Sequence, residues 1–272
     1  MDISKQKPRE NDYMAYVGPP TQYDFMGSTQ FRLLCTLGLR ANHYLLDFGC
    51  GSLRAGRLFI SYLDPIRYFG IDPNKWLIED AINHQMGEDL IRIKKPQFNY
   101  NSDFATNVFS VKFDFIVAQS IFSHAGSDLI GIALRHFKES LKLNGLIAAT
   151  FMKGISDFKG KGWVYPGFVN YRPSTIKQFA GEAGLFIIQI PWYHPHQTWY
   201  LLAKDSHRLP NKAMFRYLSG VVLFDPEFID SWKSSKKIAR TIKNYAKLVL
   251  PESIKSSIRK FMKNKTSNHK GG

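Results

Sequence analysis

The chain has few cysteines, no long apolar run and no cluster of metal-ligating residues. Its two cysteines, Cys35 and Cys50, are too few to hold 272 residues together by disulfides. No cysteine and histidine residues have the spacing of a zinc site, so we expect no metal. The first residues, 1–11, lack the apolar segment of a secretory signal, and the longest apolar runs are too short to cross a bilayer. These absences predict a cytoplasmic protein.

Positive charge is concentrated at the C-terminal end. The chain has 37 basic and 22 acidic residues, a net charge of +15. Residues 231–272 hold 12 Lys and Arg against Glu252 alone, so 12 − 1 = +11 lies there and +4 in the first 230 residues. This distribution predicts an anionic partner for the tail and not an anionic substrate for the body.

The basic tail has a helical pattern. Apolar residues recur at Ile238, Ile242, Tyr245 and Val249, with lysines and arginines on the other faces, and Pro251 interrupts the pattern. Three interpretations remain open: a helix packed on the domain, an amphipathic helix on an anionic membrane surface, and a nucleic-acid contact. Nucleic acid is less favoured than the membrane, because no RNA-binding module accompanies the lysines. A membrane contact predicts peripheral localisation at the membrane.

Strands and helices alternate between the two ends. We expect strands over 44–48, 68–71, 98–100, 113–118, 146–151, 185–190 and 198–203, and helices over 28–39, 53–63, 73–86, 128–141 and 174–183. An Asn144-Gly145 turn and a C-cap at Gly184 complete the pattern. Such alternation predicts an α/β fold with a parallel sheet. We divide the chain into an extended N-terminal arm (1–24) that closes over the site, a catalytic domain (25–205) and a basic helical extension (206–272).

The segment LLDFGCGSLRAGRLF, Leu45–Phe59, has the pattern of a ligand-binding turn. A buried strand reaches Asp47, the chain turns through Gly49 and Gly51, and a helix follows. Glycines allow the backbone to approach a ligand closely, and the helix N-terminus presents free N–H groups to an anion. A tight turn without a ligand is the alternative.

Polar residues follow the ends of three further strands. Asp72 is placed to accept hydrogen bonds from the ribose hydroxyls of a nucleoside, although it also suits a helix N-cap. Asp103 is placed to accept from an adenine amino group and Phe104 to lie against the ring, although Asp103 also suits a turn. Gln119 ends the fourth strand, where an open parallel sheet presents ligand contacts.

Four motifs then carry a family resemblance. LLDFGCGSLRAGR, GIDPNKWLIEDAI, FDFIVAQSIFSH and LKLNGLIAATF resemble the successive motifs of class I S-adenosylmethionine-dependent methyltransferases, in particular a bacterial-type subgroup with a GCGSLR turn. The resemblance covers about residues 25–205. It implies a Rossmann-like, seven-stranded sheet with helices on both faces and an antiparallel last strand. It also implies S-adenosylmethionine as cofactor, with contacts from Asp47, Gly49, Gly51, Asp72, Asp103 and Gln119.

An NAD-dependent oxidoreductase is the main rival. Its fingerprint is G-x-G-x-x-G, and here Arg54 stands at the position of the third glycine. A helix in tight contact with its strand resists that side chain, so the oxidoreductase is disfavoured.

Histidines and aromatic loops suggest the acceptor. His124, after the fourth strand, and His194, in the loop between the last two strands, are the two candidates for a general base. Aromatic residues near them suit a sugar ring or another polar cyclic acceptor. Further aromatic residues are candidates to cover the site: Tyr23 and Phe25 in the arm, and Trp163, Tyr165 and Tyr171 in a loop.

The sequence therefore predicts methylation of a hydroxyl on a small-molecule or glycan acceptor. The alternatives are an RNA methyltransferase that uses the basic tail, the oxidoreductase, and a binding protein that has the scaffold without turnover.

Overall fold

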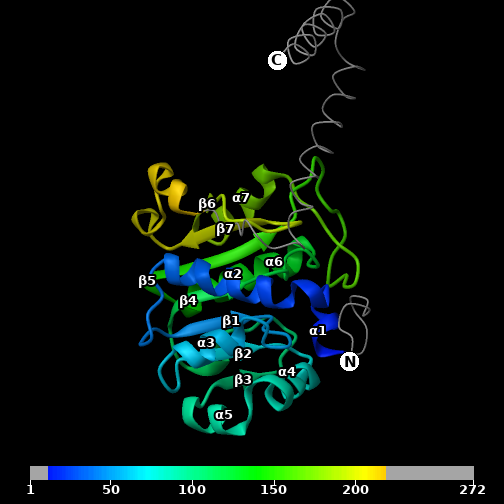
Figure 1. The fold of residues 1–272 in the computed structure, drawn as a ribbon. Helices are drawn as coiled ribbons and strands as arrows, with labels where there is room; N and C mark the ends of the chain where they lie inside the picture. The colour runs from blue at the N-terminus through cyan, green and yellow to red at the C-terminus, as the bar shows by residue number, and fades with distance from the viewer. Residues whose placement is uncertain (1–11, 219–272) are drawn as a thin grey trace, which may run out of the picture. The chain divides into compact units, whose positions relative to one another are not determined.

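A seven-stranded sheet forms the centre of residues 12–218, the part of the chain that the computed structural model describes (Figure 1). The strands are β1 (Leu45–Phe48), β2 (Tyr68–Ile71), β3 (Gln97–Asn99), β4 (Phe113–Ala118), β5 (Leu141–Phe151), β6 (Phe186–Gln189) and β7 (Thr198–Ala203). Their order is β3-β2-β1-β4-β5-β7-β6, and β7 runs antiparallel to both of its neighbours. The expected Rossmann-like sheet with an antiparallel last strand is confirmed.

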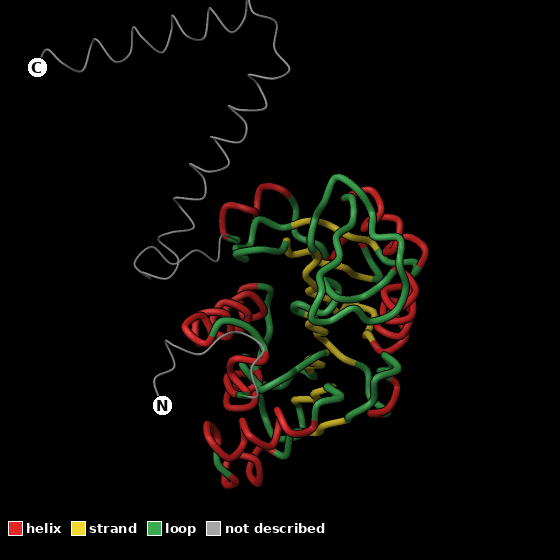
Figure 2. The backbone as a smooth tube through the Cα atoms, turned by 90° about the vertical axis from the view of Figure 1, so that its right-hand side faces the viewer, coloured by secondary structure: helices red, strands yellow, loops and turns green. Residues whose placement is uncertain are grey.

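Helices cover both faces of this sheet (Figure 2). On one face lie α2 (Tyr23–Thr36), α3 (Gly56–Tyr62) and α4 (Lys75–Ala81), whose buried residues form one hydrophobic cluster with the strands. On the other face lie α6 (Ser127–Ser140) and α7 (Pro173–Glu182), which contribute to a second cluster. The two clusters bury the sheet on both faces, which is why its central strands are mostly apolar.

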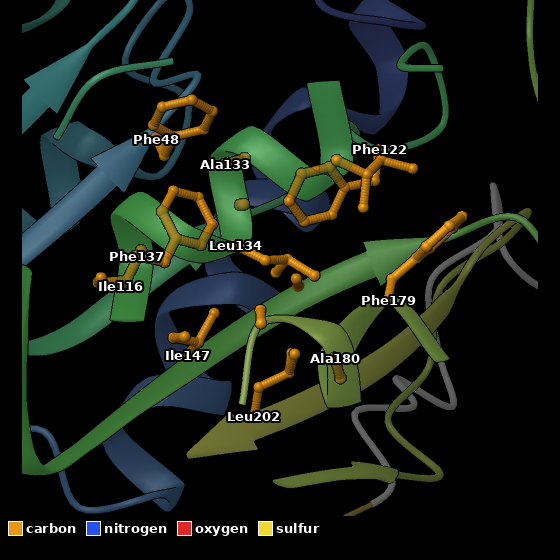
Figure 3. Close-up of a cluster of buried hydrophobic side chains, with 14 of the residues drawn as sticks. Phe48, Ile116, Phe122, Ala133, Leu134, Phe137, Ile147, Phe179, Ala180 and Leu202 are labelled. Carbon is orange, nitrogen blue, oxygen red and sulfur yellow. The ribbon is translucent and has the colours of Figure 1, made fainter. Parts of the chain in front are cut away.

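The second cluster shows how sequence spacing becomes packing. Ile130, Ala133, Leu134 and Phe137 recur at helical spacing on α6 and are fully buried (Figure 3). α7 begins with Pro173 in its first turn. Its C-cap is Ala183, one residue before the expected Gly184, which follows in the left-handed conformation at φ +64°.

Most strand bounds match the expectation, but the prediction of a turn at Asn144-Gly145 is wrong. β5 is one strand from Leu141 to Phe151. Leu141 lies opposite Phe113 while Leu146 lies opposite Phe115, so the extra residues between these pairs form an irregularity inside the strand. The Asn-Gly pair is the signal of that irregularity and not of a chain reversal.

Two expected helices also differ. The helix expected over 53–63 begins only at Gly56. The helix expected over 73–86 is α4 followed by a π-helical turn, Ile82–Met86, with Asn74 and not Pro73 preceding it. Gly87 at φ +78° ends this path, and α5 (Glu88–Lys94), which we had not expected, follows.

Residues 12–22 are not extended, which corrects the interpretation of the N-terminal arm. Asp12 Oδ1 accepts hydrogen bonds from the Met14 and Ala15 N–H groups and starts α1 (Tyr13–Tyr16). A 3₁₀ turn, Pro20–Gln22, leads directly into α2, which begins at Tyr23 and not near Ser28. The earlier start is explained by burial, because Tyr23, Phe25 and Met26 all contribute to the core. The division of the chain at residues 24 and 205 stays a prediction.

The basic tail, the helical pattern over 224–250 and residues 1–11 lie outside the described residues. Within residues 12–218, no helix has the length and apolar character that a membrane span requires.

Candidate functional site

The candidate site lies at the carboxyl ends of β1, β2 and β4. In the parallel register Asp47 pairs with Gly70 on β2 and with Val117 on β4, so the residues that end these strands meet at one edge. This is the edge at which open α/β sheets bind ligands. The sheet therefore brings Asp47, Asp72 and Gln119 to the same end of adjacent strands.

The turn after β1 is built from left-handed backbone. Gly49, Gly51 and Leu53 have φ of +74°, +50° and +53°. Gly49 N–H donates to the Ile71 carbonyl over 2.8 Å, which fixes the turn to the end of β2. A Cβ at Gly49 would collide with the Ile121 side chain, and one at Gly51 would lie 2.9 Å from Val17 Cγ1. Both glycines are thus required by conformation and by space. No sequence pattern predicts the positive φ at Leu53.

Asp72 is held at this turn by several donors. Its Oδ2 accepts the Gly51 N–H over 2.9 Å, and its Oδ1 accepts the Asn74 N–H over 2.9 Å and the Asn74 side-chain amide over 3.0 Å. Burial raises the pKa of Asp72, and the bonds from Asn74 and Gly51 oppose that rise. The helix N-cap is Asn74, so the N-cap interpretation of Asp72 is wrong. Each carboxylate oxygen retains further acceptor capacity for a ligand.

Asp47 is buried against Tyr68. The Tyr68 hydroxyl donates to Asp47 Oδ2 over 2.8 Å. Burial raises the pKa of Asp47 to about 7, the Tyr68 bond lowers it, the charge of Asp72 raises it, and Arg54 lowers it. A cationic group of a ligand close to Asp47 would stabilise the ionised form of this carboxyl group.

The loop after β3 holds the two residues expected at an adenine ring. Asp103 is exposed, and its Oδ1 accepts the Ala105 N–H over 3.0 Å, so the turn interpretation accounts for one of its oxygens. Phe104 is buried at φ +65°, with its ring 5.4 Å from Phe48 and 6.2 Å from Trp163. The adenine contacts stay predictions.

Gln119 is a buried polar residue at this edge whose side-chain amide has no partner among the described residues. The residue ends β4 and is only 7% exposed. Neither its amide oxygen nor its amide nitrogen has a hydrogen-bond partner within the described part of the chain. A buried primary amide without partners is unfavourable, and a polar ligand would satisfy it. The neighbouring Ser120, at φ +62°, accepts a bond from the Gln197 side chain over 2.9 Å, which ties the β6–β7 loop to this edge.

His124 lies among aromatic rings with a defined tautomer. Its Nδ1 is 2.6 Å from the Gly167 carbonyl oxygen. Because a carbonyl only accepts, Nδ1 carries the proton and the neutral ring keeps its basic lone pair on Nε2. The rings of Trp163, Tyr165 and Phe168 lie 5.6, 5.1 and 4.9 Å from the imidazole. Trp163 and Phe168 are 48% and 55% exposed, so an aromatic surface is open to solvent beside His124.

His194 has the opposite tautomer. Its Nδ1 accepts the His196 N–H over 3.2 Å and the Gln197 N–H over 3.1 Å, so the proton of the neutral ring sits on Nε2. Burial lowers the pKa of His194 to about 3, with smaller contributions from Arg54 and His196. This histidine is a hydrogen-bond donor at neutral pH, and the geometry disfavours it as a base.

Residues 12–22 cover the turn. Arg54 Nη1 donates to the Val17 carbonyl over 3.1 Å, and the Tyr165 hydroxyl donates to the Tyr16 carbonyl over 3.0 Å. α1 and the long loop after β5 accordingly lie at the same end of the molecule (Figure 1). Four further residues lie at this edge that the sequence does not predict there: Tyr16, Val17, Arg54 and Gln197. A charged residue inside an otherwise apolar turn was the one available signal, and it pointed to Arg54.

Three aromatic residues expected to cover the site belong to the core. Tyr23 and Phe25 are buried on α2, and the Tyr23 hydroxyl donates to the Ser52 carbonyl over 2.7 Å. Tyr171 is also buried, and its hydroxyl donates to the Ala125 carbonyl over 3.0 Å. The Phe25 ring lies 6.1 Å from the Tyr193 ring, and the Tyr171 ring lies 5.1 Å from the Phe179 ring on α7. Trp163 and Tyr165 alone therefore remain lid candidates.

One family model matches part of the chain. Residues 46–147 match the family described as "Methyltransferase domain". No curated protein sequence matches the chain.

Solved structures share the fold at low identity. An S-adenosylmethionine-dependent methyltransferase from Clostridium acetobutylicum is 14% identical with a TM-score of 0.51, over 70% of this chain and 95% of that one. The magnesium protoporphyrin IX methyltransferase of Synechocystis is 12% identical with a TM-score of 0.52, over 75% and 91%. A glycopeptide N-methyltransferase is 10% identical with a TM-score of 0.52, over 66% and 90%. Residues 46–147 are thus similar to the methyltransferase-domain family, and the chain shares the Rossmann-like fold of these solved methyltransferases.

Proposed function

We propose that this protein transfers a methyl group from S-adenosylmethionine to a hydroxyl group on a small-molecule or glycan acceptor. The observation that carries the proposal is the buried edge formed by the Gly49–Leu53 turn, the Asp72 carboxylate held against it, and the unpartnered Gln119 amide. The matched methyltransferase domain supports it, as do similar structures solved with S-adenosylmethionine or S-adenosylhomocysteine bound.

The residues at this edge fit the cofactor. Asp72 has acceptor capacity for the ribose hydroxyls, Asp103 and Phe104 suit the adenine ring, and Gln119 needs a polar partner. Gly49 and Gly51 allow close approach to the methionine portion, and Asp47 suits its ammonium group. When bound, the cofactor supplies a methyl group activated by a positively charged sulfur.

His124 is the proposed general base. Its Nδ1–H is anchored on the Gly167 carbonyl, so the ring is oriented and its Nε2 lone pair is the site that accepts a hydroxyl proton. The exposed faces of Trp163 and Phe168 beside it suit the apolar face of a sugar or another ring. Such positioning, together with the exclusion of water, supplies most of the rate gain in a displacement reaction.

The test is incorporation of a tritium-labelled methyl group from S-adenosylmethionine into components of a cell extract. The proposal predicts label in a nuclease-resistant fraction, retained after mild alkali, because methyl ethers survive alkali and methyl esters do not. The Asp72→Ala variant is the matched control, and its incorporation of label is expected to stay at the background level. Label released by alkali, or no label above this control, would contradict hydroxyl methylation.

An RNA acceptor is the second candidate, favoured by the +11 charge of residues 231–272. It predicts label that ribonuclease releases, and RNA binding that weakens with salt and is lost on removal of these residues. An NAD-dependent oxidoreductase is the third candidate function. It predicts binding of NAD, whereas both methyltransferase candidates predict binding of S-adenosylmethionine.

A further inference from the structure

Basic side chains gather around the C-terminal end of α6, away from the candidate site. The surface between α6 and α7 has a hollow of about 430 Å³, lined by Arg135, Lys138, Glu139, Glu182, Ala183 and Lys204. Leu141, the C-cap of α6, pairs with Phe113 at the start of β4, whereas Gln119 follows the end of that strand. At about 3.3 Å per residue the two ends of β4 lie about 20 Å apart, so the hollow is separate from the candidate site.

Two lysines are held at this end of α6 by backbone carbonyls. Lys204 Nζ donates to the Leu141 carbonyl over 2.6 Å, and Lys112 Nζ donates to the Glu139 carbonyl over 2.6 Å. Cations at a helix C-terminus are favourable, so these bonds also stabilise α6. Each bond uses one of the three N–H donors of an ammonium group, and two donors on each lysine remain for another acceptor.

Lys138 and Arg135 line the hollow from α6. Lys138 Nζ lies over Gly184, directly after the C-cap of α7, where an added Cβ would be 2.5 Å from it. Arg135 stands three residues before Lys138, which places both side chains on the same face of the helix. Within residues 12–218, no carboxylate forms an ion pair with Arg135, Lys138 or Lys204. The cations of the hollow therefore have no counter-charge in direct contact.

These cations repel one another. Burial lowers the pKa of Lys204, and the charges of Lys112 and Lys138 lower it further. The two acids of the lining, Glu139 and Glu182, are exposed, and neither forms an ion pair within the described part of the chain. A bound anion would relieve the repulsion and accept charge-assisted hydrogen bonds from the unused donors.

We propose that the hollow between α6 and α7 binds a phosphate group through Arg135, Lys138 and Lys204. The planar guanidinium offers paired donors that match two phosphate oxygens, and the ammonium groups bind the phosphate as point charges. The phosphate is either a soluble phosphate or the headgroup of an anionic lipid, since both offer the same chemistry. Because the hollow lies at the other end of β4 from Gln119, the inference does not depend on the proposed function.

The test measures the two sources of phosphate separately on the full chain. Titration calorimetry at constant ionic strength measures binding of inorganic phosphate, and sedimentation measures binding to neutral-lipid vesicles that contain phosphatidic acid. Arg135→Gln and Lys138→Gln are the test variants, and Lys204 is left unchanged because its bond to the Leu141 carbonyl also caps α6. Lys177→Gln, exposed on α7 and outside the hollow, is the control. Each variant removes one positive charge, so a non-specific electrostatic effect is the same in all three.

We expect Arg135→Gln and Lys138→Gln each to weaken binding of inorganic phosphate by about tenfold, since a charge-assisted bond is lost, while Lys177→Gln binds as the wild type does. Thermal unfolding without phosphate reports that the variants are folded. If the same two variants are weakened only on the vesicles, the hollow binds a lipid headgroup and not a soluble phosphate. Equal behaviour of all three variants in both measurements, or a wild-type chain that binds neither probe, would overturn the inference.

Discussion

The backbone N–H of Gly51 donates a hydrogen bond to Asp72 Oδ2 over 2.9 Å. This bond joins the turn after β1 to the end of β2, which are 21 positions apart in the chain. It keeps the carboxylate at the mouth of the turn with its remaining lone pairs available. The same contact therefore stabilises the fold locally and holds the carboxylate in place for the proposed ribose contact.

Replacing Asp72 by alanine is expected to abolish most cofactor affinity. A hydrogen bond to a charged group contributes about 1.5–3 kcal/mol, so losing two ribose contacts weakens S-adenosylhomocysteine binding by about a hundredfold or more. The free energy of unfolding falls by about 1–3 kcal/mol, because the Gly51 and Asn74 donors lose their acceptor. Calorimetry and urea unfolding measure the two effects, and unchanged affinity would remove Asp72 from the ribose role.

Gly49→Ala is expected to destabilise the protein by about 2 kcal/mol or more, through the positive φ and the collision with Ile121. Gly131→Ala on α6 is the matched control. Its Cβ would meet only Arg135 Nη1 at 3.5 Å, and alanine in a helix interior adds about 0.5–1 kcal/mol of stability. Thermal unfolding measures the melting temperatures of both variants. Similar melting temperatures would contradict the claim that a Cβ at Gly49 collides with Ile121.

Asp47 makes the stability of the ligand-free protein depend on pH. Its pKa is about 7 in the fold against an ordinary value of 3.8, so the folded state holds a proton that the unfolded chain releases. The stabilising contribution is complete below pH 3.8 and is lost as pH rises towards 7. Asp47→Asn removes this effect while keeping an acceptor for Tyr68.

The Asp47→Asn variant should therefore match the wild type near pH 4 and exceed its free energy of unfolding by about 4 kcal/mol at pH 8, since one pKa unit corresponds to about 1.4 kcal/mol. Urea unfolding at both pH values makes the comparison. A variant that is less stable than the wild type at pH 8 would show that the ionised carboxylate is paired and not merely buried.

His124→Gln is expected to lower turnover by about 10²–10⁴-fold, the usual contribution of a general base. Its affinity for S-adenosylhomocysteine should not change, because the residue is assigned to the acceptor. His194→Gln should leave turnover near the wild-type level, because Nδ1 of this histidine already accepts two backbone hydrogen bonds and its proton lies on Nε2. Single-turnover rates measured on the label-accepting fraction separate the two histidines, and equal turnover of wild type and His124→Gln would exclude the base.

Removal of residues 231–272 tests the predicted membrane contact. The full chain should sediment with vesicles that contain anionic lipid, in a salt-sensitive way, and the shortened chain should not. Vesicles of neutral lipid are the control. If neither chain sediments with anionic vesicles, the membrane interpretation of the tail is wrong.

The sequence was sufficient for the elements whose signal is local. The strands β2, β4 and β7 were predicted at their observed bounds because each is a short apolar run between clear breaks. The turn at Gly49–Gly51 and the position of Asp72 followed from the same reasoning. These features depend on composition within a few residues of the position concerned.

What the sequence did not reveal depends on contacts between distant segments. The tautomer of His124 is set by the carbonyl of Gly167, 43 positions away in the chain. The Arg54 guanidinium donates to the Val17 carbonyl, 37 positions away in the chain. α2 starts at Tyr23, earlier than expected, because Tyr23 packs against the turn after β1. Helix propensity, which depends on local sequence, does not predict that contact.

The central claim is that the turn after β1 and the carboxylate at the end of β2 hold an adenosyl cofactor that carries a sulfonium. Calorimetry of the wild-type protein with S-adenosylmethionine, S-adenosylhomocysteine and NAD in parallel tests it most directly. The account predicts saturable 1:1 binding of the first two and none of NAD. Binding of NAD without binding of either sulfur nucleoside would contradict it.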